Sequence, residues 1–119
     1  MMLDWETYRK QVAAGVSDVA KLGPDTVRCY VALGAAGQKT DLLGAKVREL
    51  IALAVAVNVR SDGCIAVHVD AAIRHGATRE EIAEALGVAT AVNAGAALVF
   101  STRVMDAYSA HEHANSATT

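Results

Sequence analysis

Cys64 and His68 are the residues whose types and spacing could most readily do chemistry. They are four residues apart, so on a helix they share one face, with Cβ atoms about 5–6 Å apart. Cys64 is expected in a first helical turn, after Ser61 or Asp62 as cap, where the dipole and free backbone amides favour a thiolate. A thiolate beside an imidazole can serve as a nucleophile or redox centre. The alternative interpretation is a small buried cysteine next to an unrelated polar histidine.

Glu49 is the third candidate, because it begins an otherwise apolar stretch that must enter a core. If that helix ends near Asn58, Glu49 lies ~13 Å from the turn, and His68 on the returning helix lies ~10 Å from it. Antiparallel packing would therefore bring Glu49 level with His68, which permits a relay of Glu49, water, His68 and Cys64. The alternative is an ordinary first-turn glutamate near Lys46, stabilised by the helix dipole.

No metal or cofactor site is expected. Cys64, His68 and His75 share one helical stripe, but the two histidines are separated by ~10 Å of helical rise. One ion with ligand bonds of ~2 Å cannot bridge that distance. His75 is better interpreted as a helix C-terminal residue, and His111 and His113 fall in a polar tail without a specific role.

Helical signals run through the whole chain, and strand signals are missing. We expect an all-α fold of about six helices. The first follows Asp4 as cap and carries an apolar stripe of Trp5, Tyr8, Val12, Val16 and Val19, and the second starts at Gly23-Pro24-Asp25. A linker over 37–44 precedes a third helix over 45–57, and a fourth runs from near Cys64 to His75-Gly76. A capping box, Thr78 with Glu81, opens the fifth, Asn93-Ala94-Gly95 is expected to break the chain before a sixth, and the tail from Ser109 is expected to fray.

Composition indicates one folded domain over residues 1–119, because 53% of the residues are hydrophobic and only 20% are charged. A net charge of −2 gives little support for nucleic-acid binding. The start of the chain carries Asp4 and Glu6 rather than an apolar core, so a signal peptide is not expected. The run Leu50–Val59 is too short to span a bilayer. A cytoplasmic location without membrane association is therefore expected.

Two cysteines are present, and in a reducing compartment free thiols are expected rather than a structural bridge. Cys29, in the middle of a helix, is interpreted as a packing residue. The third helix is apolar all round, which predicts burial on every side. Since a monomer of this size has little interior, we expect a homo-oligomer.

Three blocks of sequence resemble the carboxymuconolactone decarboxylase family, in its AhpD-like (alkylhydroperoxidase-like) branch. They are KVRELIALAV at 46–55, SDGCIAVH at 61–68 and GATREEIAEAL at 76–86, in the order and with the spacing of the family. The resemblance covers at least residues 42–108, and it implies an all-helical protein that forms a homo-oligomer, a trimer or a hexamer.

The AhpD-like motif is a glutamate, then Cys-x-x-Cys, then a histidine four residues after the second cysteine. By this resemblance Glu49 is the proton-relay glutamate, Cys64 the thiol that reacts with peroxide, and His68 the relay histidine. The first cysteine of the motif is replaced by Ser61. The internal disulfide that a dithiol partner reduces in the family therefore cannot form here.

The resulting expectation is an antioxidant peroxidase that reduces a hydroperoxide through Cys64 and is regenerated by an external thiol. One alternative is a decarboxylase of a carboxylated muconolactone in aromatic degradation, the activity of the other branch of the family. Its substrate carboxylate would need a cation such as Arg48, Arg60 or Arg74. A second alternative is a non-enzymatic oligomeric helical protein.

Overall fold

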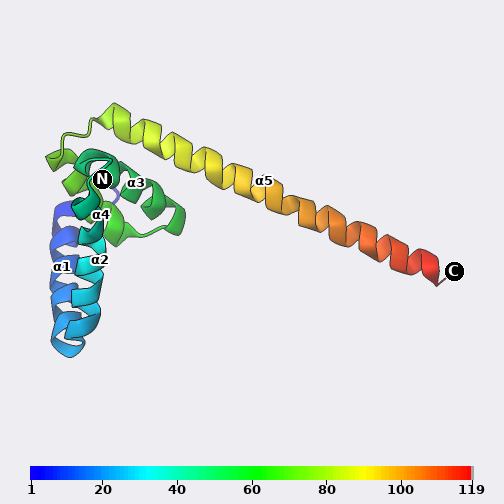
Figure 1. The fold of residues 1–119 in the computed structure, drawn as a ribbon, viewed down its shortest axis with the longest axis horizontal. Coiled ribbons are helices and arrows are strands. Elements are labelled where there is room, and N and C mark those ends of the chain that lie inside the picture. Colours follow the sequence, from blue (N-terminus) through cyan, green and yellow to red (C-terminus); the bar gives the residue numbers. More distant parts are fainter. Residues whose placement is uncertain (119) are drawn as a thin grey trace.

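The computed structural model describes residues 1–118, which form five helices and no strand. The helices are α1 (Trp5–Leu22), α2 (Pro24–Thr40), α3 (Ala45–Val59), α4 (Asp62–Arg74) and α5 (Arg79–Ala117). The all-α class is confirmed. Helices α1 and α2 form a hairpin, α3 and α4 lie at its end, and α5 leaves this body as a long arm (Figure 1).

The first two helices begin as their sequences predict. The Asp4 side chain caps α1 by accepting a hydrogen bond from the Thr7 amide at 3.2 Å. Pro24 opens α2 directly after Gly23. Helix α2 continues to Thr40, so the expected linker over 37–44 shortens to residues 41–44. Helix formation continues because nothing in this stretch before Asp41 blocks the backbone hydrogen bonds.

A two-residue connection makes α3 and α4 pack against each other. Arg60 follows the last residue of α3 as its C-cap and adopts a left-handed conformation with φ 56°, and Ser61 then caps α4. Only these two residues separate the helices, so α4 turns back and packs along α3. At the far end of α4, Gly76 takes the left-handed conformation (φ 84°) predicted for a residue after a helix.

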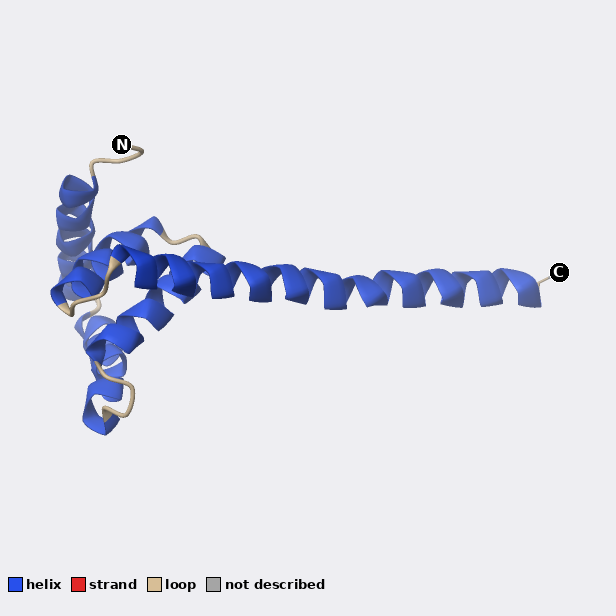
Figure 2. Cartoon of the chain, turned by 90° about the horizontal axis from the view of Figure 1, so that it is seen from above, coloured by secondary structure: helices blue, strands red, loops and turns tan. Residues whose placement is uncertain are grey.

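The expected break at Asn93-Ala94-Gly95 and the separate sixth helix are wrong. Helix α5 is continuous over 39 residues and includes the segment from Ser109 that was expected to fray. Asparagine and glycine each cost at most ~1 kcal/mol in a helix interior, and no proline interrupts the run. Figure 2 shows α5 projecting straight from the body.

The interior of a single chain is thin. Among the described residues the buried hydrophobic side chains are Leu53, Ala56, Ala66, Ala71, Ala72 and Ala89, from α3, α4 and α5. The expectation that α3 is buried on every side is wrong for one chain, because Ile51 and Val55 are about half exposed (48% and 55%). Two neighbouring helices cannot cover all faces of a third.

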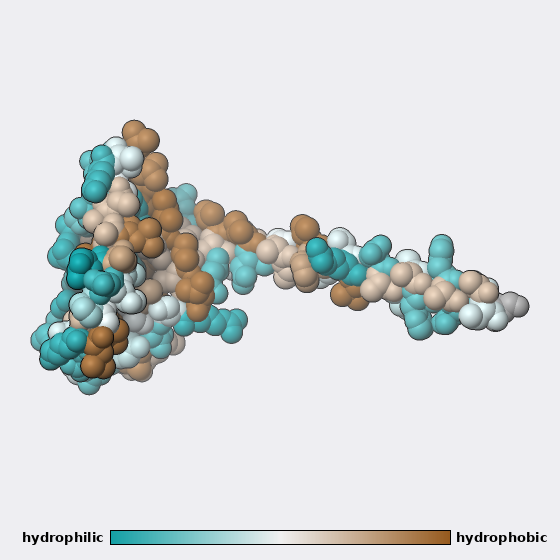
Figure 3. Space-filling view, turned by 60° about the horizontal axis from the view of Figure 1, so that its bottom comes forward, coloured by the Kyte–Doolittle hydropathy of each residue, from teal (hydrophilic) through white to brown (hydrophobic). Residues whose placement is uncertain are grey.

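Helix α5 is also long and apolar enough to cross a membrane, by length and composition alone. Its most apolar 18-residue window has a mean hydropathy of 1.6, and 6% of that window is buried. The expectation of no membrane span rested on the shorter run Leu50–Val59, since a break at Asn93-Ala94-Gly95 was expected within residues 79–117. Figure 3 shows apolar side chains on the inner part of the arm and on the body beside its base, with more polar ones farther out.

Candidate active site

A groove of about 600 Å³ between α1, α2 and α4 contains both Cys64 and His68. Its walls are mostly apolar side chains. Its lining residues are Arg9, Val12, Ala13 and Val16 of α1, Tyr30 of α2, and Ser61, Gly63, Cys64, Val67, His68, Asp70 and Arg74 at and within α4. The predicted nucleophile and its neighbouring imidazole therefore face one shared cavity.

Cys64 lies in the first turn of α4, as its sequence position predicts. Ser61 is the cap, and its hydroxyl oxygen accepts a hydrogen bond from the Cys64 amide at 3.2 Å. The sulfur is a free thiol on a partly exposed residue. The thiol therefore lies beside the backbone N–H groups of the first turn of α4 and opens on the groove.

Glu49 and His68 are in direct contact. A carboxylate oxygen of Glu49 lies 2.7 Å from Nδ1 of His68, across the packing of α3 on α4. This contact confirms that the two side chains lie level, and it corrects the expected water between them, because no room for a water remains at 2.7 Å. A carboxylate accepts, so Nδ1 donates and Nε2 is the ring nitrogen free to accept a proton.

Both side chains of this pair remain partly accessible, at 21% for Glu49 and 29% for His68. They open on different cavities. His68 lines the groove with Cys64, whereas Glu49 lines a separate polar pocket of about 270 Å³ with Gln38, Asp41, Arg48 and His75. The pair thus lies between the groove and a second pocket.

The cations at the groove already have acidic partners. Arg9 pairs with Glu6 at 2.7 Å, and Arg74 pairs with Asp70 at 3.0 Å. The pKa of Arg9 is raised, first by its hydrogen bond to Glu6 and then by the charges of Glu6 and Asp70. The groove therefore presents balanced charge at its edge and apolar side chains inside.

The other arginines considered for a substrate carboxylate are not in this groove. Arg48 pairs with Asp41 at 2.7 Å beside the second pocket. Arg60 is an exposed residue at the end of α3. Of the three candidates, only Arg74 lines the groove, and it is already paired.

The remaining predicted residues lie apart from the site. Cys29 is exposed, so its interpretation as a packing residue is wrong for a single chain. His75 is the residue that ends α4, as predicted. His111 contacts Asn115 far along α5, and His113 is exposed there. Within residues 1–118 no three histidine, cysteine or acidic side chains converge as metal ligands would.

Sequence reasoning missed the α1 wall of the groove. Val12 and Val16 were expected only as part of an apolar stripe of the first helix, and both line the cavity, with Val16 42% exposed. The spacing of Arg9, Val12 and Val16 places them on one helical face, which was a usable signal. Residue spacing predicts that these side chains share a face of α1, but it does not predict which other helix that face packs against.

Comparison with known proteins agrees with this architecture. A family model described as the carboxymuconolactone decarboxylase family matches residues 24–107. An uncharacterised protein of Haemophilus influenzae is 43% identical over 109 residues, covering 92% of this chain and 96% of the relative. An uncharacterised protein of the cox locus of Paracoccus denitrificans is 32% identical over 95 residues, covering 80% and 86%. The chain therefore belongs to the carboxymuconolactone decarboxylase family.

Proposed function

We propose that the protein is an AhpD-like peroxidase with a single reactive cysteine, acting on a neutral hydroperoxide. The observation that carries the proposal is the Glu49–His68 hydrogen bond of 2.7 Å, with His68 one helical turn from Cys64 in the same groove. A carboxylate that orients an imidazole beside a nucleophile is the arrangement that general acid–base catalysis requires.

The reaction begins at the Cys64 sulfur. His68 accepts the thiol proton, and the thiolate attacks one peroxide oxygen, so that an S–O bond forms and the O–O bond breaks. The departing alkoxide takes the proton back from His68 and leaves as an alcohol. Cys64 is then a sulfenic acid, oxidised by two electrons, and the hydroperoxide is reduced by the same two.

Ser61 dictates how the enzyme is regenerated. A hydroxyl cannot form a disulfide, so an external thiol attacks the sulfenic acid, forming a mixed disulfide and releasing water. A second thiol then releases Cys64 as a thiol and leaves as the disulfide of the reductant. The balance is one hydroperoxide and two thiols to one alcohol, one disulfide and one water.

The charges at the groove favour this reaction over decarboxylation of a carboxylated lactone. A carboxylate substrate needs an unpaired cation, but Arg9 and Arg74 are both engaged by acidic side chains. A neutral organic hydroperoxide needs only the apolar walls of Val12, Val16 and Val67.

The test compares peroxide consumption by the wild type and Cys64→Ser, with dithiothreitol, glutathione or a dihydrolipoyl donor as reductant. We expect turnover that requires Cys64 and favours glutathione, and a sulfenic acid at Cys64 that a dimedone-type reagent traps. Cys29→Ser is the matched control and should leave both readouts unchanged. Decarboxylation that survives Cys64→Ser would instead support the lyase activity, and an unreactive Cys64 would support a non-enzymatic role.

A further inference from the structure

The Ser61 side chain carries a hydrogen-bond donor that the fold leaves unused. The backbone N–H of Ser61 donates to the Ala56 carbonyl at 3.0 Å, and its carbonyl accepts from the Ile65 amide at 3.0 Å. Its hydroxyl oxygen accepts from the Cys64 amide at 3.2 Å. A hydroxyl also has a proton to donate, and within residues 1–118 the structure gives that proton no acceptor. Three hydrogen bonds therefore fix Ser61, and its hydroxyl proton stays available to a bound molecule.

This hydroxyl lies beside the reactive sulfur. Ser61 and Cys64 both line the groove. The Ser61 hydroxyl oxygen is 3.2 Å from the Cys64 nitrogen, and three covalent bonds join that nitrogen to the sulfur. The hydroxyl oxygen and the sulfur therefore lie within about 7 Å of each other, about twice the distance at which an oxygen reacts or forms a hydrogen bond. One oxygen of a bound molecule can then lie close to both groups.

The other side-chain donors of the groove are engaged elsewhere or come from another wall. Arg9 and Arg74 are held by acidic side chains. His68 directs Nδ1 to its carboxylate partner, and its other nitrogen serves the thiol proton. Tyr30 comes from α2 and is 63% exposed. Of the side-chain donors that the described residues bring to this groove, Ser61 is the one bonded to the nucleophile's own backbone.

Helix α1 covers this turn of α4 with apolar side chains. A methyl group on the Gly63 Cα would lie 3.7 Å from a methyl carbon of Val12, which is ordinary contact. Val12 and Val67 line the groove with Ser61. Apolar surroundings strengthen a hydrogen bond relative to water, so a donor placed here acts on a bound oxygen more strongly than one in solvent.

We propose that the Ser61 hydroxyl is a catalytic hydrogen-bond donor that holds the hydroperoxide oxygen attacked by Cys64. The inference rests on the peroxidase reaction proposed above. Ser61 precedes Cys64 by three residues and His68 follows it by four, so the two groups flank the sulfur along the chain. The hydroxyl binds the attacked oxygen, and His68 returns the proton to the departing one.

The proton of Ser61 is not transferred, so the balance of the reaction is unchanged. The S–O bond forms, the O–O bond breaks, and the attacked oxygen stays on Cys64 as the sulfenic acid, still beside the hydroxyl. The donor acts by orienting the O–O bond in line with the sulfur. One positioned donor contributes ~10²–10³-fold in enclosed active sites. Because this groove is open, we expect a contribution of at least tenfold.

Two rates measured on Cys64 test this role in the full-length Cys29→Ser protein. One is sulfenic acid formation by tert-butyl hydroperoxide, trapped with dimedone, and the other is alkylation by iodoethane, which has no oxygen to accept a hydrogen bond. Ser61→Ala should lower the ratio of oxidation to alkylation at least tenfold. Ser61→Thr, which keeps both the cap and the hydroxyl, should restore the ratio to within threefold of the wild type.

Thr78→Ala is the matched control. It removes the cap of α5, where Thr78 accepts from the Glu81 amide at 3.0 Å, and it lies outside the groove. Its ratio should equal that of the wild type. Ser61→Asp separates donor from cap, because a carboxylate still accepts from the Cys64 amide but has no proton to donate. Its ratio should fall as far as that of Ser61→Ala.

A wild-type ratio in Ser61→Ala or in Ser61→Asp would overturn the role of Ser61. Circular dichroism checks that α4 survives, and since threonine and aspartate are both good caps, their comparison decides the outcome if the alanine variant unfolds. Wild-type Cys64 that iodoethane alkylates but peroxide does not oxidise would refute the peroxidase function itself, and with it this role. Rapid oxidation that is indifferent to Ser61→Ala would refute the role of Ser61 alone.

Discussion

Glu49 orients His68, the proposed proton acceptor, through a hydrogen bond of 2.7 Å. Glu49→Gln keeps the shape of the side chain but removes its charge, so it cannot stabilise a protonated imidazole. We expect Cys64 oxidation by a hydroperoxide to slow by ~10²-fold or more, the usual contribution of a positioned acid–base group. Stopped-flow measurement of oxidation checks this, with Glu80→Gln as control. An unchanged rate would remove Glu49 from the mechanism.

Ser61 stands where the Cys-x-x-Cys motif has its first cysteine, so this site has one thiol instead of two. It caps α4 three residues before Cys64, a spacing compatible with the Cα separation of ~5.5 Å common in disulfides. Ser61→Cys should form a disulfide with Cys64 under mild oxidation and raise turnover with dithiol reductants, because the resolving thiol is then internal. Thiol titration before and after oxidation measures the bond.

Ser61→Ala is the matched control for that variant. It loses the hydrogen bond to the Cys64 amide, at a cost of ~1 kcal/mol in stability, without gaining a thiol. Turnover with dithiols should not rise. If the two thiols of Ser61→Cys stay free after oxidation, the correspondence of position 61 with the first motif cysteine is wrong.

At the scale of elements, the turn between α3 and α4 stores strain at Arg60. This residue has φ 56° and ψ 48°, a conformation that costs an ordinary L-residue about 1–2 kcal/mol. Arg60→Gly should therefore raise the free energy of unfolding by ~1 kcal/mol, whereas Arg60→Ala should leave it nearly unchanged. Denaturant titration of the three proteins compares them, and equal stability of the glycine and alanine variants would contradict the strain.

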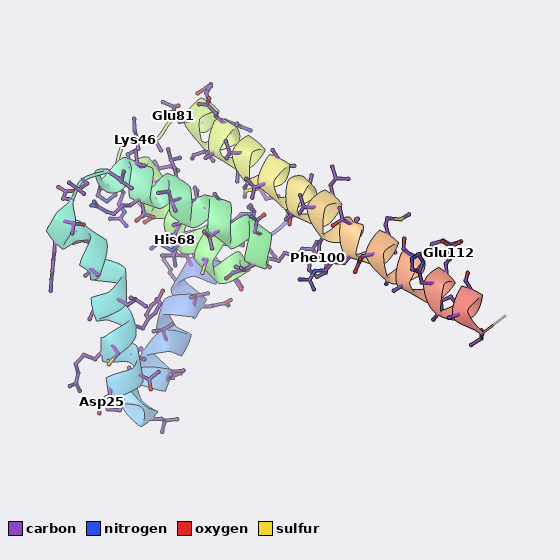
Figure 4. All side chains as sticks on the ribbon, turned by 45° about the vertical axis from the view of Figure 1, so that its right-hand side comes forward. Asp25, Lys46, His68, Glu81, Phe100 and Glu112 are labelled. Carbon is purple, nitrogen blue, oxygen red and sulfur yellow. The ribbon has the colours of Figure 1, made fainter. Side chains whose placement is uncertain are left out.

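The start of α5 is fixed to α3 by an acid-sensitive contact. Lys46 lies 2.7 Å from Glu81, which also completes the capping box with Thr78, and Figure 4 shows both residues where α5 begins. Lys46, and next the Thr78 backbone, hold the pKa of Glu81 below its ordinary value of 4.5. Because the folded pKa is lowered, this stabilisation is complete above pH 4.5 and is lost as pH falls through the folded value.

The matching experiment compares unfolding of the wild type and Glu81→Gln across pH. The wild type should be more stable at neutral pH, and its advantage should shrink below pH 4.5. Glu80→Gln, in the same helical turn, should not reproduce this pH dependence. A difference between the wild type and Glu81→Gln that stays constant into acid would contradict the role of the Glu81 charge.

At the scale of the whole molecule, the thin core and the exposed arm imply a stability that depends on assembly. We expect sedimentation to give a trimer or hexamer of the 12.4 kDa chain, and the thermal midpoint to rise with protein concentration. A stable monomer at micromolar concentration, with a midpoint independent of concentration, would contradict this expectation. Leu98→Glu should lower the midpoint, and Arg103→Ala, on the far side of the helix from Leu98, should not.

Features that depend on near neighbours along the chain are predictable from the amino-acid sequence alone. The Asp4 and Ser61 caps, the Thr78–Glu81 capping box and Gly76 are local, because each satisfies backbone groups within four residues. The contact between Glu49 and His68 was also predictable from the sequence. A short turn makes the two helices antiparallel, so the distance of each residue from the turn shows that the two lie level.

Tertiary structure decided what depends on surfaces meeting. The wall of the groove comes from α1, and its apolar stripe looks the same in the sequence whether it faces a core, a cavity or water. Helix α5 continues through Asn93 and Gly95 because the free-energy cost of these two residues in a helix is small. Residue type and spacing do not predict whether such a small cost ends the helix. The predicted burial of Ile51, Val55 and Cys29 is wrong for a single chain. Hydrophobicity favours removing a side chain from water, but it does not specify which chain covers that side chain.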